Sequence, residues 1–367
     1  SAQQMVATAE DLHGAGIDVP ILVGGAALSR NFTVKRIRPA YGDGLVLYAQ
    51  DAMIGLSLMD RIVRPSERAG LLALATESDD RPAAVETLVA SAEAPAVRSR
   101  EVSLDVALPA APDTDEHLEE ITDLDALWEW INPAMLYGRH MGLKGAARKI
   151  GTDDPKARKV VEAVEDVKRM ARDGALRVRC AWRFFAAEGA GNTLRLLHPD
   201  GTVAASWQLP RQRRAEGLCL ADYVLPAQGG RRDHVAVFVT TAGEGVRDLA
   251  EDLKQRGEFV RCHALQALAV ESAEAAAEML HARLRAAWGF PDPAGTTMMQ
   301  RFQARYRGKR YSFGYPACPE LEMQDGLFGI LRPERIGVTL TEGHMMDPEA
   351  SVSALVFHHP DAAYFAV

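Results

Sequence analysis

The sequence predicts an incomplete, Rossmann-like α/β half-domain over residues 1–65, a linker over 66–103, and an α+β domain over 104–367 with an antiparallel sheet and long helices. A continuous apolar run at 21–23 stops at two glycines, as is typical of a strand buried on both faces of a parallel sheet. Beyond residue 103, strand-like runs follow one another without regular helical alternation, which favours antiparallel pairing.

The half-domain is expected to run helix, strand, helix, strand, helix. Its first helix carries Met5, Ala9 and Leu12 at helical spacing and ends at Gly14 or Gly16. Half of a doubly wound sheet is not a stable domain, so we expect the missing strands to precede Ser1 in a longer chain. The other elements are predicted as a strand at 21–23, a helix at 31–38, a strand at 45–49 and a helix at 51–64.

Residues 66–103 are rich in Ala, Glu, Ser and Pro and poor in large apolar residues, which indicates a linker that is partly helical at most. In the following domain, an amphipathic pattern predicts a helix over 155–173 with Gly174 as its stop. The longest helix is predicted from Glu271 to Trp288. Strands are expected at 176–185, 193–197, 202–208, 234–241, 337–341 and 352–357.

Composition excludes several classes of protein. The 367 residues are 47% hydrophobic and 25% charged, unlike a disordered chain. The net charge of −8 argues against an extended nucleic-acid surface. The longest apolar stretch, 21–28, is far below the ~18 residues that span a membrane, and no secretory signal opens the chain. Four widely spaced cysteines without a CxxC pair favour a reducing cytoplasm over a disulfide framework or zinc knuckle.

Local patterns for common chemistry are weak. Gly189-Ala190-Gly191 lacks the third glycine and the helix of a dinucleotide loop, so it predicts a plain turn. His358-His359 ends a strand, where consecutive side chains face opposite sides and cannot easily share a metal ion. Because no Ser or Cys lies in a nucleophile elbow either, we expect neither catalytic side chains nor a metal site.

The segment from Arg305 to Glu320 is unusual because basic residues alternate with aromatic ones before a turn with two prolines. Such residues stack on bases and pair with phosphates in nucleic-acid proteins. Alternatively, the Arg310 guanidinium can hold a small-molecule carboxylate in a bidentate fork. A third interpretation is a basic surface strand followed by a tight loop.

The stretch Arg310-x-x-x-Gly314-Tyr315-Pro316-Ala317-Cys318-Pro319-Glu320 resembles the RxxxGYPACPE motif of the S-adenosylmethionine-binding activation domain in the cobalamin-dependent methionine synthase family. Other blocks agree in order over nearly the whole chain. Residues 218–224 resemble the family's CLADF segment, 341–353 its TESxxMxPxASVS strand, and 359–367 its HPDxxYYAV end. Residues 23–26 and 48–52 resemble the last half of its cobalamin-binding domain.

This resemblance implies a role in reactivation. The family transfers methyl from methyltetrahydrofolate to homocysteine through methylcobalamin, and its activation domain presents S-adenosylmethionine when the cobalamin is oxidised. An electron from flavodoxin or a similar reductase is then required. The implied partners are this reductase and the upstream domains of the same enzyme, which would hold the zinc, homocysteine, folate and cobalt-ligating histidine sites that this sequence lacks. Catalysis would come from proximity and orientation.

The family's functional residues can be carried over by position. Arg310 matches the arginine that binds the ligand carboxylate, and Ser312 falls where a backbone group contacts the ligand. Glu274 lies where the family has a ligand-site carboxylate. The aromatic pair beside the ligand matches Tyr364 and Phe365, and the cobalamin-binding positions match Gly24, Gly25 and Ala52.

Three positions depart from the family. Asn132 stands where the family has an aspartate for the ligand's amino group, Asp347 replaces a tryptophan, and Ala304 replaces a carboxylate. An amide oxygen still accepts a hydrogen bond from ammonium, but without the strength of a charged partner. These changes concern ligand affinity more than ligand identity. They also motivate an alternative, a non-catalytic regulatory or scaffold module that retains the fold.

Overall fold

The computed structural model describes residues 2–24, 30–49, 52–64, 67, 70–72, 75, 97–226 and 232–367. The chain divides into two compact units, which are described separately below. The first contains residues 1–94 together with 319–322 and 340–345, and the second contains the remainder. Most of the predicted linker, including 76–96, lies outside the described residues.

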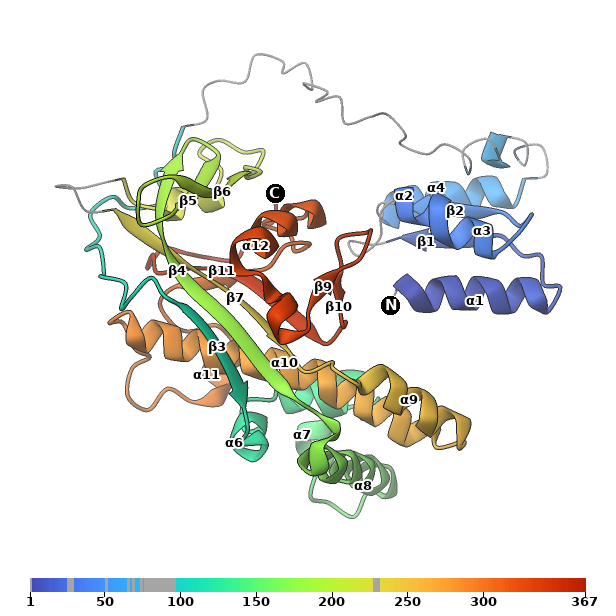
Figure 1. Cartoon of the computed structure of the whole chain (residues 1–367). Coiled ribbons are helices and arrows are strands. Elements are labelled where there is room, and N and C mark those ends of the chain that lie inside the picture. The colour runs from blue at the N-terminus through green and yellow to red at the C-terminus, as the bar shows by residue number, and fades with distance from the viewer. Residues whose placement is uncertain are drawn as a thin grey trace. The chain divides into compact units, whose positions relative to one another are not determined.

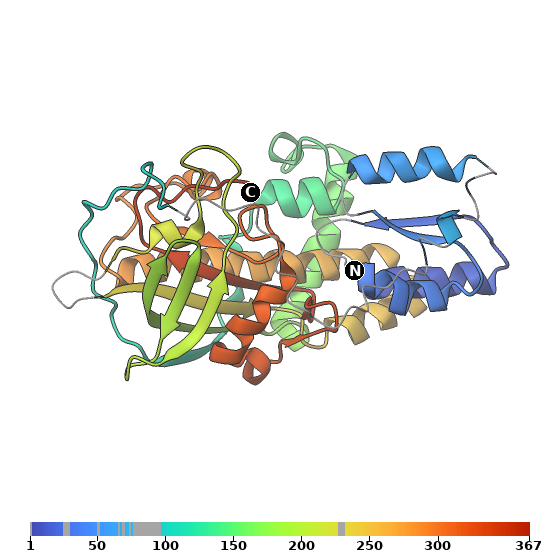
Figure 2. The ribbon, with the colours of Figure 1, turned by 90° about the horizontal axis from the view of Figure 1, so that it is seen from above.

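The N-terminal segment has two parallel strands among its described residues, with Val23 opposite Tyr48. Ala9, Val23, Ile37 and Val46 form a core on one face of the strand pair, while Leu47 and Leu58 belong to a second core. Figure 2 shows α4 on one side of the strands and α1 on the other. The elements are α1 (Ala2–Gly14), β1 (Ile21–Gly24), α2 (Arg30–Phe32), η1 (Thr33–Ile37), α3 (Arg38–Ala40), β2 (Val46–Ala49) and α4 (Ala52–Ile62).

This order of elements agrees with the sequence prediction, and the strands are parallel as expected. Position 24 has no room for a side chain, because a Cβ there would lie 1.9 Å from the Ala49 carbonyl oxygen on the neighbouring strand. The interpretation of this segment as half of a larger Rossmann-like domain stays a prediction.

The second unit is built on a seven-stranded sheet in the order β6-β5-β4-β7-β11-β8, with β3 paired to β4. Every strand pair in this sheet is antiparallel, as the sequence predicts. Gly191, at φ +58°, lies in the turn between β4 and β5, so Gly189-Ala190-Gly191 is part of a hairpin. The strands are β3 (Glu116–Ile121), β4 (Val178–Ala190), β5 (Thr193–Leu197), β6 (Val203–Gln208), β7 (Asp233–Thr241), β8 (Lys309–Tyr311) and β11 (Ser351–Phe357); β9 (Thr339–Leu340) and β10 (Met346–Asp347) pair separately.

Helices cover both faces of this sheet (Figure 1). Phe238 and Val356 pack with α10 in the main core. Ser353, which has the opposite parity from Val356 on β11, donates to Gln324 of α12 at 2.7 Å. The helical elements are α6 (Leu124–Trp128), η3 (Ala134–His140), α7 (Ala146–Lys149), α8 (Pro155–Met170), η4 (Ala171–Ala175), η5 (Leu220–Tyr223), α9 (Val246–Gln255), α10 (Phe259–Ala287), α11 (Met298–Phe302), η6 (Leu321–Met323), α12 (Gln324–Leu331) and η7 (Pro333–Ile336).

The predicted long helix is longer than expected, because α10 begins at Phe259 and not at Glu271. The helix from Pro155 has the predicted bounds to within a few residues, with Asp154 as its N-cap and Gly174 at φ +100° beyond its end. None of the described helices combines the length and the apolar character that crossing a membrane requires.

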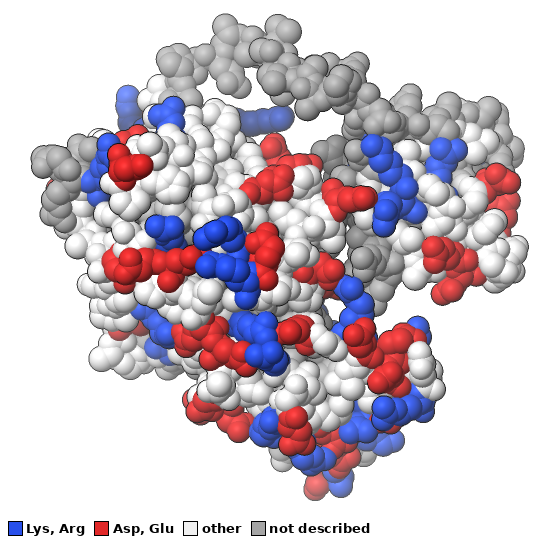
Figure 3. Space-filling model, viewed as in Figure 1, with Lys and Arg blue, Asp and Glu red and all other residues white. Residues whose placement is uncertain are grey.

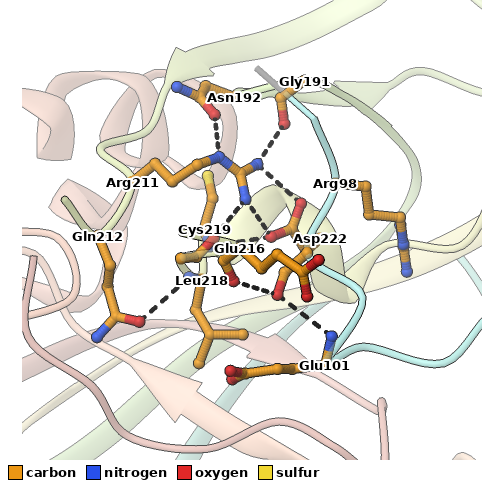
Figure 4. A network of polar contacts seen from close by, with 12 residues as sticks. Arg98, Glu101, Gly191, Asn192, Arg211, Gln212, Glu216, Leu218, Cys219 and Asp222 are labelled. Carbon is orange, nitrogen blue, oxygen red and sulfur yellow. Dashed lines mark hydrogen bonds and ion pairs between the residues drawn. The ribbon is translucent and has the colours of Figure 1, made fainter. Parts of the chain in front are cut away.

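A buried ion pair explains the segment that resembles CLADF (Figure 4). The Arg211 guanidinium donates to both oxygens of Asp222 at 2.6 and 2.8 Å and to Asn192 Oδ1 at 2.7 Å. Asp222 is 1% exposed and also accepts a hydrogen bond from the Cys219 backbone N–H. Cys219 is the N-cap residue of η5. These contacts tie η5 to the β4–β5 turn, so the segment has a structural role at the edge of the sheet.

Candidate ligand-binding site

Arg310 is placed by the register of the outer strand pair. It lies opposite Val356, where β8 pairs with β11. Directly opposed residues project from the same face of a sheet, and Val356 belongs to the core that includes α10. Arg310 therefore extends over α10, and its side chain is only 17% exposed. The next residue, Tyr311, projects to the opposite face.

Two carboxylates of α10 meet this guanidinium. Arg310 Nη2 lies 3.4 Å from Glu274 Oε2 and 3.5 Å from Glu278 Oε2. Burial by itself would lower the pKa of Arg310, but the two carboxylates outweigh it and raise the pKa above the ordinary arginine value. The site therefore holds a permanent cation between two acidic side chains.

The two glutamates belong to a polar stripe along α10. Residues spaced three or four apart share one face of a helix, and the stripe consists of Glu271, Glu274, Glu278, His281 and Arg285. At one end, Glu271 Oε1 lies 3.0 Å from His140 Nε2. Burial raises the pKa of Glu271 to about 7, and the nearby charge of Glu274 adds to this effect. Burial lowers the pKa of His140.

The turn after β8 is held by the backbone. The Gly314 N–H donates to the Cys318 carbonyl at 2.8 Å, and the Cys318 N–H donates to the Tyr315 carbonyl at 2.8 Å. Gly314 has φ +81°, a conformation that glycine adopts at little cost. Although Tyr315 is 60% exposed, desolvation and Glu274 raise the pKa of its phenol, and Arg310 acts in the opposite direction. The turn thus brings Tyr315 to the Arg310–Glu274 pair.

Tyr364 of the C-terminal tail lies near Arg310, because burial raises the pKa of its phenol and the Arg310 charge acts in the opposite direction. The Tyr364 ring lies 5.5 Å from the Tyr311 ring, and the Phe365 ring lies 6.4 Å from it. Tyr364 is 56% exposed, so it offers an aromatic surface near the charged group. The tail is fixed because the Val367 N–H donates to the Pro316 carbonyl and Gln212 Nε2 donates to the Ala366 carbonyl.

Asn132 and Ser312 have more indirect positions. Asn132 Oδ1 accepts from the Ala134 N–H at 3.0 Å, so the side chain caps η3, the segment that carries His140 to Glu271. In the part of the chain that the structure describes, no hydrogen bond or ion pair joins Asn132 to Glu274. Ser312 is half-buried directly after β8, with the same parity as Arg310.

The two other departures from the family pattern lie outside this contact set. Asp347 is paired with the exposed Arg247 at 2.5 Å. Ala304, just beyond α11, has a positive φ of 51°. Among the cobalamin-matched positions, Gly24 ends β1 and Ala52 begins α4, while Gly25 lies outside the described residues.

The basic residues of 305–310 have separate partners. Arg307 Nε donates to the His358 carbonyl, and Lys309 Nζ donates to the Tyr306 and Gly308 carbonyls. Acidic and basic side chains alternate on the face drawn in Figure 3. These positions favour the small-molecule interpretation of the segment over the nucleic-acid one.

The adjacent histidines also have separate partners. His358 Nε2 lies 2.8 Å from Asp233 Oδ1, and His359 Nε2 lies 2.9 Å from the Ser103 carbonyl. Their rings are 6.3 Å apart. Within the described ranges, no group of three or more His, Cys, Asp or Glu side chains has the arrangement of a metal site.

Sequence reasoning missed Glu278 and Tyr306 as neighbours of Arg310, and Glu271 as a member of the same polar stripe. The available signal was the spacing of the three glutamates at positions 271, 274 and 278, which predicts a shared helix face. That signal gave no reason to connect the face with Tyr306, which approaches α10 only through the tertiary fold.

Comparisons with known proteins agree on the class of protein. The family model for the vitamin B12 dependent methionine synthase activation domain matches residues 123–367. The crystal structure of the MetH reactivation domain bound to AdoHcy is similar, with a TM-score of 0.65 and 26% identity, over 72% of this chain and 84% of that one. The chain therefore belongs to the B12-dependent methionine synthase activation-domain family.

Curated relatives extend the similarity to the N-terminal segment. Methionine synthase of Mycobacterium tuberculosis is 31% identical over 400 residues, covering 98% of this chain, and that of Mycobacterium leprae is 29% identical over 401 residues. The chain spans about a third of the length of these relatives.

Proposed function

We propose that this chain is the reactivation part of a cobalamin-dependent methionine synthase, and that it binds S-adenosylmethionine beside Arg310. The observation that carries this is the Arg310–Glu274 pair near Tyr364. The amino-acid end of the ligand has one carboxylate and one ammonium, which complement a guanidinium and a carboxylate 3.4 Å apart. The half-exposed aromatic residues offer an apolar surface to the rest of the ligand.

The roles of the individual residues follow from their chemistry. Arg310 would hold the carboxylate, and Glu274, whose side chain is 41% exposed, would accept from the ammonium. Asn132 would assist from the start of η3, and Ser312 would contribute its backbone. Tyr364 and Phe365 would limit the ligand's freedom, so that its methyl group is presented in a fixed orientation.

The wider organisation is also a proposal. Residues 1–65 would be the C-terminal half of a Rossmann-like cobalamin-binding domain with Gly24, Gly25 and Ala52 at its ligand, 66–103 the linker, and 104–367 the activation domain. When bound, cobalamin would supply the cobalt that accepts the methyl group. Gly24 fits packing between strands and does not by itself indicate cobalamin.

We place this activity in a methyltransferase that moves methyl from methyltetrahydrofolate to homocysteine, with upstream domains of the same enzyme as partners and zinc confined to them. The wide spacing of the four cysteines, without a CxxC pair, supports the cytoplasmic location expected from the sequence.

A reductase such as flavodoxin is the proposed electron donor. Support comes from a local excess of positive charge in a chain whose net charge is −8. The basic residues of 139–159 outnumber the two acidic ones, Asp153 and Asp154; they are Arg139, Lys144, Arg148, Lys149, Lys156, Arg158 and Lys159. Lys156 and Lys159 border a shallow groove lined also by exposed Phe259 and Val260.

A donor with an acidic face would dock at this groove. The double variant Lys156→Glu, Lys159→Glu should therefore abolish the salt-sensitive binding of flavodoxin. Unchanged binding would exclude this face.

Calorimetric titration of the chain with S-adenosylmethionine and S-adenosylhomocysteine tests the proposed function. Binding that is lost in Arg310→Ala and kept in Arg283→Ala is the expected result, because Arg283 pairs with Glu119 away from this site. Absence of binding by the unaltered chain would favour the alternative, a regulatory or scaffold module with the same fold.

A further inference from the structure

We propose that Glu278 is a positioning residue, which fixes the Arg310 guanidinium for the ligand carboxylate through a buried chain of contacts that begins at Asp292. This inference rests on the proposed function and deepens it, because it separates the roles of the two glutamates that meet Arg310.

The two glutamates differ in exposure. The Glu278 side chain is 10% exposed, against 41% for Glu274, although both lie about 3.5 Å from the same guanidinium nitrogen. An exposed carboxylate can leave Arg310 and accept a hydrogen bond from a ligand at little cost, since water and the ligand replace its partner. A buried carboxylate cannot, because loss of its cation leaves an uncompensated charge. Glu278 therefore stays with Arg310 while Glu274 is free to exchange.

Glu278 is held from behind by Tyr306. The Tyr306 hydroxyl donates to Glu278 Oε2 at 3.4 Å, and both residues are 8% exposed. Glu278 Oε2 thus faces two donors, the tyrosine and Arg310. This shared acceptor sets the distance between the tyrosine and the guanidinium.

Tyr306 in turn cannot rotate away, because a charged residue covers its ring. The Arg285 guanidinium carbon lies 3.8 Å from the ring centroid, and the His281 ring meets it edge-on at 5.3 Å. Arg285 is fully buried and is held by both oxygens of Asp292 at 2.8 and 2.9 Å. Asp292 also accepts from Arg301 at 2.9 Å.

The other oxygen of Glu278 marks one point where this chain of contacts is incomplete; Arg285 Nη1 and both ring nitrogens of His281 are others among the described residues. Glu278 Oε1 is buried and has no hydrogen-bond partner among the described residues. A buried carboxylate oxygen without a donor is costly, and native proteins keep few such groups. A hydrophobic residue of similar volume at position 278 would avoid the desolvation cost of this oxygen. The presence of a glutamate beside Arg310 is explained if its side chain serves to orient the guanidinium.

The test compares two ligands in a matched set of variants. S-adenosylhomocysteine has the carboxylate that Arg310 would hold, whereas 5′-deoxy-5′-methylthioadenosine lacks the whole amino-acid end. Glu278→Gln should weaken S-adenosylhomocysteine about tenfold and leave the second ligand unchanged. Glu119→Gln, which breaks the exposed pair with Arg283, should change neither.

Equal weakening of both ligands, or no change in either, would overturn the role of Glu278 while leaving the proposed function intact. Failure of the unaltered chain to bind S-adenosylhomocysteine would overturn both. If Glu278→Gln does not fold, Tyr306→Phe provides the test, because it removes the hydroxyl that contacts Glu278 and keeps the ring on Arg285. Tyr306→Phe should shift the ratio of the two affinities in the same direction by a smaller factor.

Discussion

Arg310 and Glu274 form a part-buried ion pair, with Nη2 of the arginine 3.4 Å from Oε2 of the glutamate. One residue lies on the short outer strand β8 and the other in the middle of α10, so only the folded chain brings them together. A zwitterionic ligand can exchange this internal pair for two pairs of its own, one to each residue. Arg310 and Glu274 therefore already satisfy each other before the ligand arrives, and the net gain depends on the geometry of the new contacts.

The first prediction concerns that geometry at Arg310. A guanidinium offers a planar fork to a carboxylate, whereas an ammonium offers a point charge. Arg310→Lys should therefore weaken S-adenosylmethionine binding by about 1–3 kcal/mol. Calorimetric titration measures this, with Arg283→Lys as a matched control at another paired arginine. An affinity equal to that of the unaltered chain would show that Arg310 does not hold the carboxylate.

The second prediction concerns recognition of the ammonium. If Glu274 carries the negative charge, Glu274→Gln should weaken S-adenosylmethionine binding more than Asn132→Ala does, and Asn132→Asp should tighten it, by about 1.5–3 kcal/mol for a charge-assisted contact. Asn132 also caps η3. Asn132→Ala should thus cost about 1 kcal/mol of stability, which thermal unfolding measures separately. Neutral Glu274→Gln together with loss of binding in Asn132→Ala would remove Glu274 from this role.

Local signals in the sequence predicted the elements whose ends are marked by capping residues. Gly174 follows one helix as predicted, whereas the N-cap of that helix, Asp154, is a signal that the prediction did not use. The start of α10 was missed although Ala264, Leu265 and Leu268, which precede the predicted start, are buried in the core. Residues 264–270 are apolar except for Gln266, and a run that is apolar nearly all round shows no single stripe for periodicity to detect. Only the first turn, where Phe259 and Val260 are 64% and 61% exposed, projects from the core.

The candidate site was predictable in part, for a related reason. The motif around Arg310 was recognised by resemblance to a family. Its contact with Glu278 depends on the register of β8 against β11 and on the packing of α10 below them. Neither is encoded by a local pattern, because both are settled by pairings between residues that are distant in the chain. Tyr306 was missed for the same reason, because its contact with Glu278 joins residues that are distant in the chain.

The third prediction concerns the ion pair between Arg211 and Asp222. Asp222 is 1% exposed and receives two bonds from the guanidinium as well as one from the Cys219 N–H. Asp222→Asn leaves a largely buried cation without its counter-charge and should destabilise the fold by about 3 kcal/mol. Urea unfolding measures the change. Glu101→Gln, which breaks an exposed pair with Arg214, should have little effect, and equal effects of the two substitutions would contradict this account.

The last prediction concerns the pH dependence of stability at Glu271. Its side chain is 5% exposed, and burial, with the charge of Glu274, raises its pKa from 4.5 to about 7. Between these values the folded chain holds a proton that the unfolded chain has released, so Glu271 makes stability fall as the pH rises. His140, whose pKa burial lowers below 6.5, acts in the opposite direction just below that value.

Glu271→Gln isolates the carboxylate, because the amide keeps the shape of the side chain and does not titrate. The variant should be stabilised relative to the unaltered chain by an amount that grows from pH 4.5 to 7 and then levels off, at up to roughly 3 kcal/mol. Urea unfolding at a series of pH values measures this difference, and His140→Gln combined with Glu271→Gln removes the contribution of the histidine that contacts Glu271. A difference that does not change with pH would mean that Glu271 ionises normally, and its contact with His140 Nε2 at 3.0 Å would then be an ordinary ion pair.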